Sequence, residues 1–148
     1  MPNSCKISAS RTMAVSANPE LKTVVVLCID DSEDVLECEK SFLESFGYTV
    51  LTAANGAKGL ELASSHSVDI VIVDYFMPGM NGQEVAIEMR RVRPLAPIIL
   101  LTGAPDVPDQ ALELVDALVA KDRLASELLP TIAQLHGCES TLPPWCEA

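Results

Sequence analysis

The sequence has no long hydrophobic run and carries little positive charge. Its longest apolar stretches span about six residues, far below the roughly twenty that a membrane-spanning helix requires. The N-terminus contains Lys6 and Arg11 but no continuous apolar segment, which argues against a secretory signal peptide. The 10 Lys and Arg residues against 21 Asp and Glu give a net charge of −11, which opposes binding to nucleic acid and anionic lipid. We therefore expect a cytoplasmic chain that binds neither nucleic acid nor membrane by itself.

The cysteines lack the pattern of a metal site. The five are Cys5, Cys28, Cys38, Cys138 and Cys146, an odd number without the close paired spacing of zinc ligands. Cys28 falls in a predicted strand and Cys38 in a predicted helix, where cysteine behaves as a small hydrophobe. Cys138 and Cys146 flank a proline-rich segment and could pair, although two exposed thiols are the simpler expectation. This cysteine usage predicts a reduced, cytosolic protein.

The length and composition predict one folded domain with short extensions. A chain of 148 residues can bury roughly two-thirds of its unfolded surface, and 49% hydrophobic residues with a mean hydropathy of +0.26 are typical of a globular protein. Residues 1–20 are rich in Ser, Ala and Asn, so we expect a flexible N-terminal extension. We expect the folded domain at residues 21–138 and a C-terminal tail at 139–148. The sequence shows no internal repeat.

Short apolar runs alternate with helical periodicity along the domain, which predicts an α/β fold with a parallel sheet and helices on both faces. The predicted strands are residues 23–29, 49–52, 69–73, 97–101 and 116–120, and the predicted helices are 33–46, 56–64, a segment after Gly82 up to 91, 109–115 and 125–135. Ser32 and Gly47 are expected to cap and end the first helix. Pro130 is expected in the first turn of the last helix or at a kink.

Polar residues follow the apolar runs at the points where the predicted strands end. They are Asp30 and Asp31, then Asp74, Thr102 and Lys121. Ligands of open parallel α/β sheets bind outside the carboxyl ends of the strands, so one pocket would collect these side chains. Three carboxylates favour a hard divalent cation, and a hydroxyl and an ammonium suit the oxygens of a phosphoryl group.

Each of these residues alone has a simpler structural interpretation. An Asp at a strand end commonly caps the next helix, a Thr before glycine is commonly part of a turn, and a lone lysine is commonly solvated. The recurrence of such residues at four strand ends of one βα series favours a functional site.

The residues that carry this pattern also resemble the receiver domain of the two-component response regulators. The matching stretches are residues 25–31, 69–82, 97–103 and the strand that ends in Lys121. The resemblance covers roughly residues 21–138. It implies a flavodoxin-like, doubly wound five-stranded sheet of order 2-1-3-4-5. It also implies that Asp74 accepts a phosphoryl group from a phosphohistidine on a sensor histidine kinase or a phosphotransfer protein.

The resemblance further implies a role for each site residue. Asp31 would bind Mg²⁺ directly and Asp30 mainly through water, with Asp74 and the backbone carbonyl of Phe76 completing the protein ligands; Mn²⁺ is an alternative ion. Thr102 and Lys121 would read the phosphorylated state. Asp74 must be ionised to attack, so the metal and Lys121 are expected to lower its pKa.

Three positions depart from the usual receiver pattern. Leu118 stands where receivers carry Tyr or Phe, so the coupling of the threonine to an aromatic rotamer is not expected here. Asp122 follows the lysine in place of proline, and a trans peptide bond is expected because a non-proline cis bond costs about 2.5–4 kcal/mol. Phe76 replaces a polar side chain. We hypothesise that Phe76 and Ala104 screen the acyl phosphate and lengthen its lifetime.

The leading interpretation is a stand-alone phosphoacceptor signalling domain, not an enzyme, because no effector domain fits in the roughly ten residues after the last helix. It would switch a protein contact or pass the phosphoryl group on to an unknown downstream protein. A receiver cut from a hybrid kinase fits equally well. A degenerate receiver that binds partners without phosphorylation is the first alternative. An aspartyl-phosphate hydrolase and an FMN-binding protein rank lower, because the paired-aspartate motif and the phosphate-cradling loop that they require are missing.

Overall fold

The computed structural model describes residues 23–103 and 107–136. The predicted N-terminal extension at 1–20 and the tail at 139–148 lie outside these residues, as do Ala104, Cys138 and Cys146. The domain boundaries therefore stay a prediction. Within the described residues, no helix is both long and apolar enough to cross a membrane.

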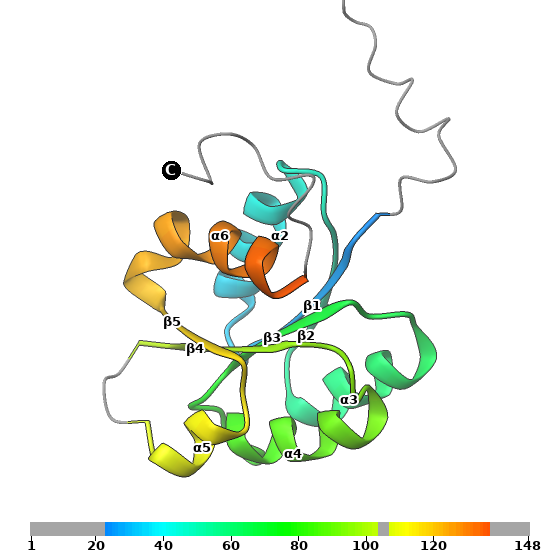
Figure 1. The fold of residues 1–148 in the computed structure, drawn as a ribbon, viewed down its shortest axis with the longest axis vertical. Coiled ribbons are helices and arrows are strands. Elements are labelled where there is room, and N and C mark those ends of the chain that lie inside the picture. The colour runs from blue at the N-terminus through cyan, green and yellow to red at the C-terminus, as the bar shows by residue number, and fades with distance from the viewer. Residues whose placement is uncertain (1–22, 104–106, 137–148) are drawn as a thin grey trace, which may run out of the picture.

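Five parallel strands form the centre of the molecule (Figure 1). They are β1 (Val25–Ile29), β2 (Thr49–Ala53), β3 (Ile70–Asp74), β4 (Ile98–Thr102) and β5 (Ala117–Ala120), in the order β2-β1-β3-β4-β5. Every neighbouring pair is parallel, so all carboxyl ends lie at one edge of the sheet. The predicted sheet and its strand order are confirmed.

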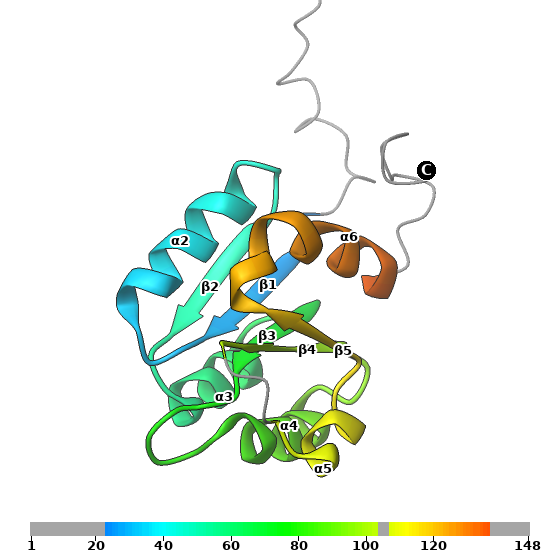
Figure 2. The same cartoon turned by 90° about the vertical axis from the view of Figure 1, so that its left-hand side faces the viewer.

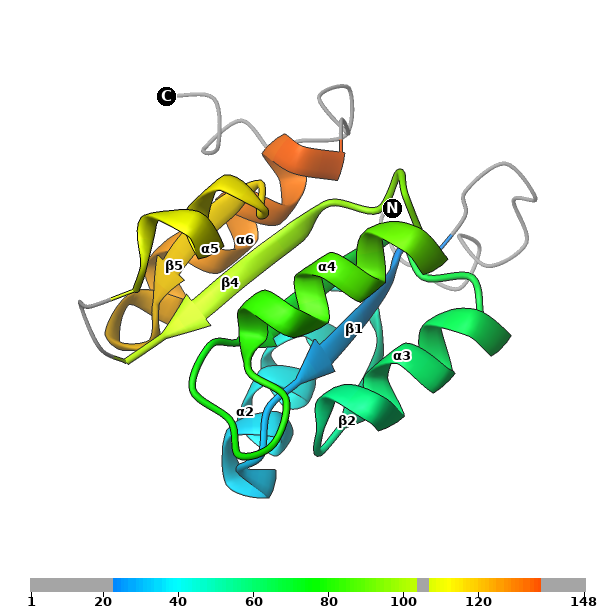
Figure 3. The same ribbon diagram turned by 90° about the horizontal axis from the view of Figure 1, so that it is seen from below.

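Helices cover both faces of this sheet, as predicted. The helical elements are α2 (Glu33–Glu44), α3 (Gly56–Ser65), α4 (Gly82–Val92), α5 (Asp109–Glu113), a 3₁₀ turn η2 (Lys121–Arg123) and α6 (Leu124–His136). Helices α2 and α6 pack on one face, and α3, α4 and α5 pack on the other (Figure 2). Seen from below in Figure 3, α3 and α4 lie side by side against the sheet.

The strand sequences explain this two-sided packing. Successive strand residues point to opposite faces, and in β1 the side chain of Leu27 joins the α3–α4 cluster while those of Val26 and Cys28 join the α2–α6 cluster. Strands β3 and β4 are buried along their whole length, as expected for parallel strands covered on both faces. The edge strand β5 is only partly covered, and Leu118 is 46% exposed.

The first helix begins as predicted but ends earlier. The Ser32 hydroxyl accepts a hydrogen bond from the backbone N–H of Val35, which caps α2. The helix ends at Glu44, and Gly47 has a φ of +98°, a conformation that glycine adopts without steric cost. Phe46, the last residue of the predicted helix, lies beyond the end of α2 and is exposed, with its ring edge-to-face against that of Phe42.

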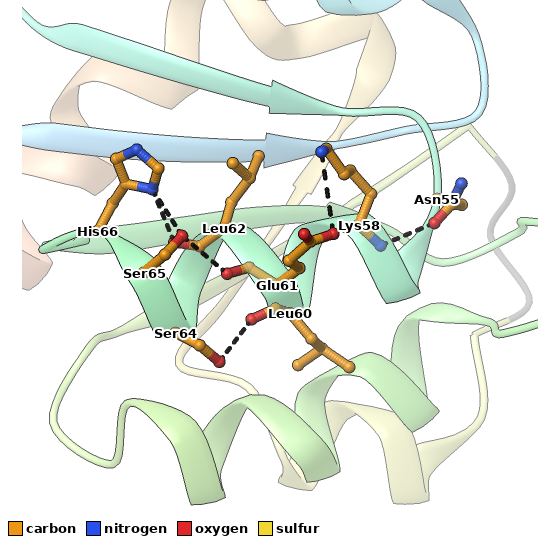
Figure 4. A network of polar contacts seen from close by, with 8 residues as sticks. All are labelled: Asn55, Lys58, Leu60, Glu61, Leu62, Ser64, Ser65 and His66. Carbon is orange, nitrogen blue, oxygen red and sulfur yellow. Dashed lines mark hydrogen bonds and ion pairs between the residues drawn. The ribbon is translucent and has the colours of Figure 1, made fainter.

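Side-chain contacts to backbone fix both ends of α3 (Figure 4). The Asn55 side chain accepts from the backbone N–H of Lys58 at the start of the helix. In the last turn the hydroxyls of Ser64 and Ser65 donate to carbonyls of the preceding turn. Arg93, the residue that follows α4, donates to the carbonyl oxygens of Ala63 (2.8 Å) and His66 (2.5 Å). These two hydrogen bonds join the C-terminal ends of α3 and α4.

Pro130 lies inside α6 and not in its first turn, the first of the two positions expected for it. It is the seventh residue of α6, well past the first turn, and it is exposed. Proline has no N–H to donate to the carbonyl of Ser126, and the hydroxyl of Thr131 donates to the next carbonyl, that of Glu127. The helix therefore continues through the proline on its solvent side.

Candidate functional site

The carboxyl ends of four strands place the predicted polar residues next to one another. Asp30 directly follows β1, Asp74 is the last residue of β3, Thr102 is the last of β4, and Lys121 directly follows β5. The register pairs Ile29 with Val73, so Asp30 and Asp74 occupy equivalent positions at the ends of the adjacent strands β1 and β3. The sheet thus brings the predicted residues to one rim of the molecule.

Three carboxylates form a cluster at this rim. One oxygen from each of Asp30, Asp31 and Asp74 lies within 4.8 Å of the others. Asp30 is 1% exposed and Asp74 4%, whereas Asp31 is open to solvent. Asp30 is held in place because its Oδ1 accepts a hydrogen bond of 2.9 Å from the backbone N–H of Ser32. The cluster therefore has a rigid, buried side and a solvent-facing side.

Lys121 provides the positive charge of the site. Its Nζ lies 3.1 Å from Oδ2 of Asp30 and 3.3 Å from Oδ1 of Asp74. Partial burial by itself lowers the pKa of Lys121, but the hydrogen bonds and charges of the two aspartates raise it above the ordinary value. Lys121 is therefore a permanent cation between two buried carboxylates.

The pKa of Asp74 is raised to about 6. Burial is the largest cause, and the negative charge of Asp30 adds to it, while Lys121 lowers the pKa. Lys121 lowers the pKa of Asp74, as the sequence led us to expect, but one ammonium does not offset burial next to a second carboxylate.

Gly82 supports Asp74 from the start of α4. Its backbone N–H donates to the carbonyl of Tyr75 at 2.9 Å. A Cβ atom at this position would lie 2.8 Å from Cα of Tyr75 and 2.9 Å from the carbonyl oxygen of Asp74. Only glycine permits this close approach of α4 to the end of β3.

The positions that depart from the receiver pattern lie around the cluster. Phe76 is 50% exposed, and its ring lies edge-to-face against Tyr75 with centroids 4.6 Å apart. Thr102, Leu118 and Lys121 line one hollow of about 600 Å³ beside the carboxylates. The described residues contain no cis peptide bond, so the trans bond expected between Lys121 and Asp122 is confirmed.

The donor set fits a hard divalent cation. Three carboxylates face a single ammonium, so the cluster carries excess negative charge, and carboxylate oxygens are the protein ligands that Mg²⁺ prefers. The exposed side chain of Asp31 leaves the cluster accessible from solvent. A cation bound there would lie beside a carboxylate and an ammonium, an arrangement suited to a phosphoryl group.

Comparison with known proteins agrees with this geometry. A family model described as the response regulator receiver domain matches residues 26–128, more than half of the chain. The chain belongs to this family. Two solved receivers support the assignment, with TM-scores of 0.72 and 0.70: the response regulator TrrA of Thermotoga maritima, crystallised with Mg²⁺ and BeF, and the chemotaxis protein CheY4 of Vibrio cholerae. TrrA is 35% identical and covers 76% of this chain and 99% of its own; CheY4 is 28% identical and covers 77% and 99%.

The curated relatives are longer proteins. The receiver is 38% identical over 88 residues to the transcriptional regulatory protein GlrR of Escherichia coli, matching 60% of this chain and 20% of GlrR. It is 32% identical over 89 residues to the alkaline phosphatase synthesis transcriptional regulatory protein PhoP of Bacillus subtilis, matching 60% of this chain and 37% of PhoP. The match therefore spans between a fifth and two-fifths of these relatives.

Sequence reasoning missed one buried carboxyl in this receiver. Glu39 on α2 is 1% exposed, and the thiol of Cys28 donates a hydrogen bond to it. Glu39 is spaced three residues after Leu36 and four before Leu43 on the apolar side of α2, and this spacing could have predicted its burial from the sequence. Cys28 is buried as expected, but Cys38 is exposed on the outer side of the same helix, so its assignment as a small hydrophobe was wrong.

Proposed function

We propose that this receiver domain accepts a phosphoryl group on Asp74 in a Mg²⁺-dependent reaction. The observation that carries the proposal is the position of Lys121, whose Nζ lies 3.3 Å from Asp74 and 3.1 Å from Asp30. The three clustered carboxylates support it, since they provide a cation site next to the proposed acceptor. A phosphohistidine on a sensor histidine kinase or phosphotransfer protein would be the donor.

The reaction is an in-line displacement at phosphorus. A carboxylate oxygen of Asp74 attacks, a P–O bond forms as the P–N bond to the histidine breaks, and the imidazole leaves with the bonding electron pair. Lys121 stabilises the negative charge on the phosphoryl oxygens, and the hydroxyl of Thr102 donates to another of them. Asp74 reacts in its ionised form, which its raised pKa makes scarce in acid.

Asp30, Asp31, Asp74 and the backbone carbonyl of Phe76 are the proposed holders of Mg²⁺, with Mn²⁺ as an alternative. When bound, the cation neutralises charge on the phosphoryl oxygens. The solved TrrA structure contains Mg²⁺ and BeF, and the 35% identity of that receiver supports the same assignment here.

The proposed output is a change in protein contacts or onward transfer of the phosphoryl group to another protein. The domain acts as a signalling module, not as a turnover enzyme, and supports its own phosphorylation and dephosphorylation. The net charge of −11 disfavours direct contact of this chain with nucleic acid, although GlrR and PhoP are named transcriptional regulatory proteins. Cytoplasmic location and stand-alone action stay predictions from the sequence.

The test is incubation with acetyl phosphate, with Mg²⁺ or with a chelator, followed by intact-mass measurement. We expect one phosphoryl group per wild-type chain only with Mg²⁺, none in Asp74→Asn, and full labelling in the matched control Asp34→Asn, an exposed aspartate on α2. Sustained release of phosphate would instead indicate a hydrolase. No labelling of the wild type would favour the degenerate receiver.

A further inference from the structure

Glu39 is a charged residue type on the buried side of a helix. It lies on α2 among residues that pack against β1 and α6, and it is 1% exposed. Its Oε2 has no hydrogen-bond partner among the residues that the structure describes. A buried carboxylate with one oxygen left without a partner carries a large desolvation cost, so the position favours a neutral, protonated carboxyl.

The groups around Glu39 belong to the site. Cys28, two residues before Asp30 on β1, donates its thiol hydrogen bond to the Glu39 carboxylate. Asp30 and Asp74 also act on Glu39 electrostatically, and Lys121 from η2 acts with the opposite sign. Lys40, the next residue on α2, acts on Cys28. Glu39 therefore interacts electrostatically with the charged groups of the carboxylate cluster and is itself buried.

The balance of these groups leaves Glu39 close to its titration point at neutral pH. Burial is the largest cause of a pKa raised to about 7, the thiol and Lys121 lower it, and the two aspartates raise it. Added positive charge in the cluster would favour the ionised form, and added negative charge on Asp74 would favour the neutral form.

We propose that Glu39 is a positioning residue that couples a proton to the site: at neutral pH it is partly protonated when the cluster holds no divalent cation, and it releases this fraction of a proton to solvent when a cation binds. The negative charge of the resulting Glu39 carboxylate then partly compensates the positive charge of the bound cation. Phosphorylation of Asp74 would reverse the effect and favour uptake of a proton by Glu39. This inference rests on the proposed cation site and adds a buried residue outside the predicted ligand set.

The direct consequence is that cation affinity depends on pH near neutrality. Metal binding that displaces protons becomes tighter as pH rises, and the slope of log affinity against pH equals the number of protons released. Since Glu39 titrates at about pH 7, about half a proton would be released at that pH, and affinity would rise by about threefold between pH 6.5 and 7.5. Asp74 contributes a smaller part, because its pKa of about 6 leaves it mostly ionised.

The test is isothermal titration calorimetry of the full chain with MgCl₂ at pH 7 in two buffers with different ionisation enthalpies, which counts the protons released. We expect the wild type and the control Glu37→Gln, an exposed glutamate on α2, to release about half a proton more than Glu39→Gln. Glu39→Met is a second variant that removes the titrating group with little change in volume. Circular dichroism verifies that each variant is folded.

An infrared difference spectrum of the wild type at pH 7 gives a readout that needs no variant. Loss of a protonated-carboxyl band on addition of Mg²⁺ is the expected result. Equal proton release from wild type and Glu39→Gln, or an unchanged carboxyl band, would overturn the role of Glu39 while the proposed function stands. Failure of the wild type to bind Mg²⁺ would overturn both.

Discussion

The Nζ atom of Lys121 lies 3.3 Å from Oδ1 of Asp74, across the end of the sheet between η2 and β3. Asp74 is buried and its pKa is raised to about 6 even with this ammonium beside it. The ion pair therefore lowers the cost of a buried negative charge without removing it. The remaining cost is what a divalent cation at the cluster would offset.

Replacing Lys121 by Ala should slow phosphorylation of Asp74 by acetyl phosphate by about ten- to a hundredfold, the effect of losing one or two hydrogen bonds to a charged group. The pKa of Asp74 should also rise, because Lys121 lowers it in the wild type. Labelling followed by intact mass over time measures the rate. The control is Lys58→Ala, an exposed lysine on α3; equal rates in the two variants would contradict the role of Lys121.

Replacing Glu39 by Gln should change how stability depends on pH. The folded-state pKa of Glu39, about 7, exceeds its ordinary value of 4.5, so its stabilising contribution is complete below pH 4.5 and is lost as pH rises through 7. The amide of Gln does not titrate, so the variant does not lose stability in this pH range through residue 39. The free energy of unfolding of Glu39→Gln relative to wild type should therefore increase by about 2 kcal/mol from pH 5 to pH 8. Urea denaturation at several pH values measures this, and parallel curves would show that Glu39 does not titrate near neutrality.

Replacing Phe76 by Asn should shorten the lifetime of the acyl phosphate. The Phe76 side chain is half exposed and packs against Tyr75 directly after the acceptor strand, where an apolar ring would keep water from phosphorus. The amide of Asn would instead hydrogen-bond to water. We expect loss of the phosphoryl group to be several times faster, measured after the phosphodonor is removed. An unchanged rate would refute the screening role of Phe76. Ala104, the second residue of that hypothesis, lies outside the described residues.

Replacing Gly82 by Ala should destabilise the domain by about 1–3 kcal/mol, because the new methyl group would overlap with backbone atoms of Asp74 and Tyr75. Gly103→Ala is the matched control. Its Cβ would meet only the flexible Lys121 side chain, at 3.7 Å, and we expect a change within about 0.5 kcal/mol. Denaturation midpoints of the two variants measure the difference, and similar values would contradict the close packing of α4 against β3.

Much of the fold and the assembly of the predicted site residues could be read from the sequence. The buried strands are continuous apolar runs, and each run ends in a polar residue, so the rule that parallel strands present their carboxyl ends at one edge predicts where Asp30, Asp74 and Lys121 meet. The resemblance to receivers supplied the strand order. These features are local in sequence or follow from topology.

Features that depend on several elements at once were not predicted. The raised pKa of Asp74 results mainly from burial, and the role of Glu39 requires that α2 packs against β1, the strand that carries Cys28 and ends next to Asp30. The end of α2 before Phe46 and the mid-helix position of Pro130 were not predicted, because helix periodicity does not show where tertiary contacts end a helix or leave one side solvated. In each case the deciding contacts are distant in sequence.

The central claim is that Asp74, and no other carboxylate of the cluster, receives the phosphoryl group. Borohydride reduces an acyl phosphate to an alcohol, so it converts a phosphorylated aspartate to homoserine while free carboxylates do not react. Peptide mapping of the chain after acetyl phosphate, Mg²⁺ and borohydride identifies the residue. We predict homoserine at position 74 alone; homoserine at position 30 or 31, or at none of the three, would contradict the account.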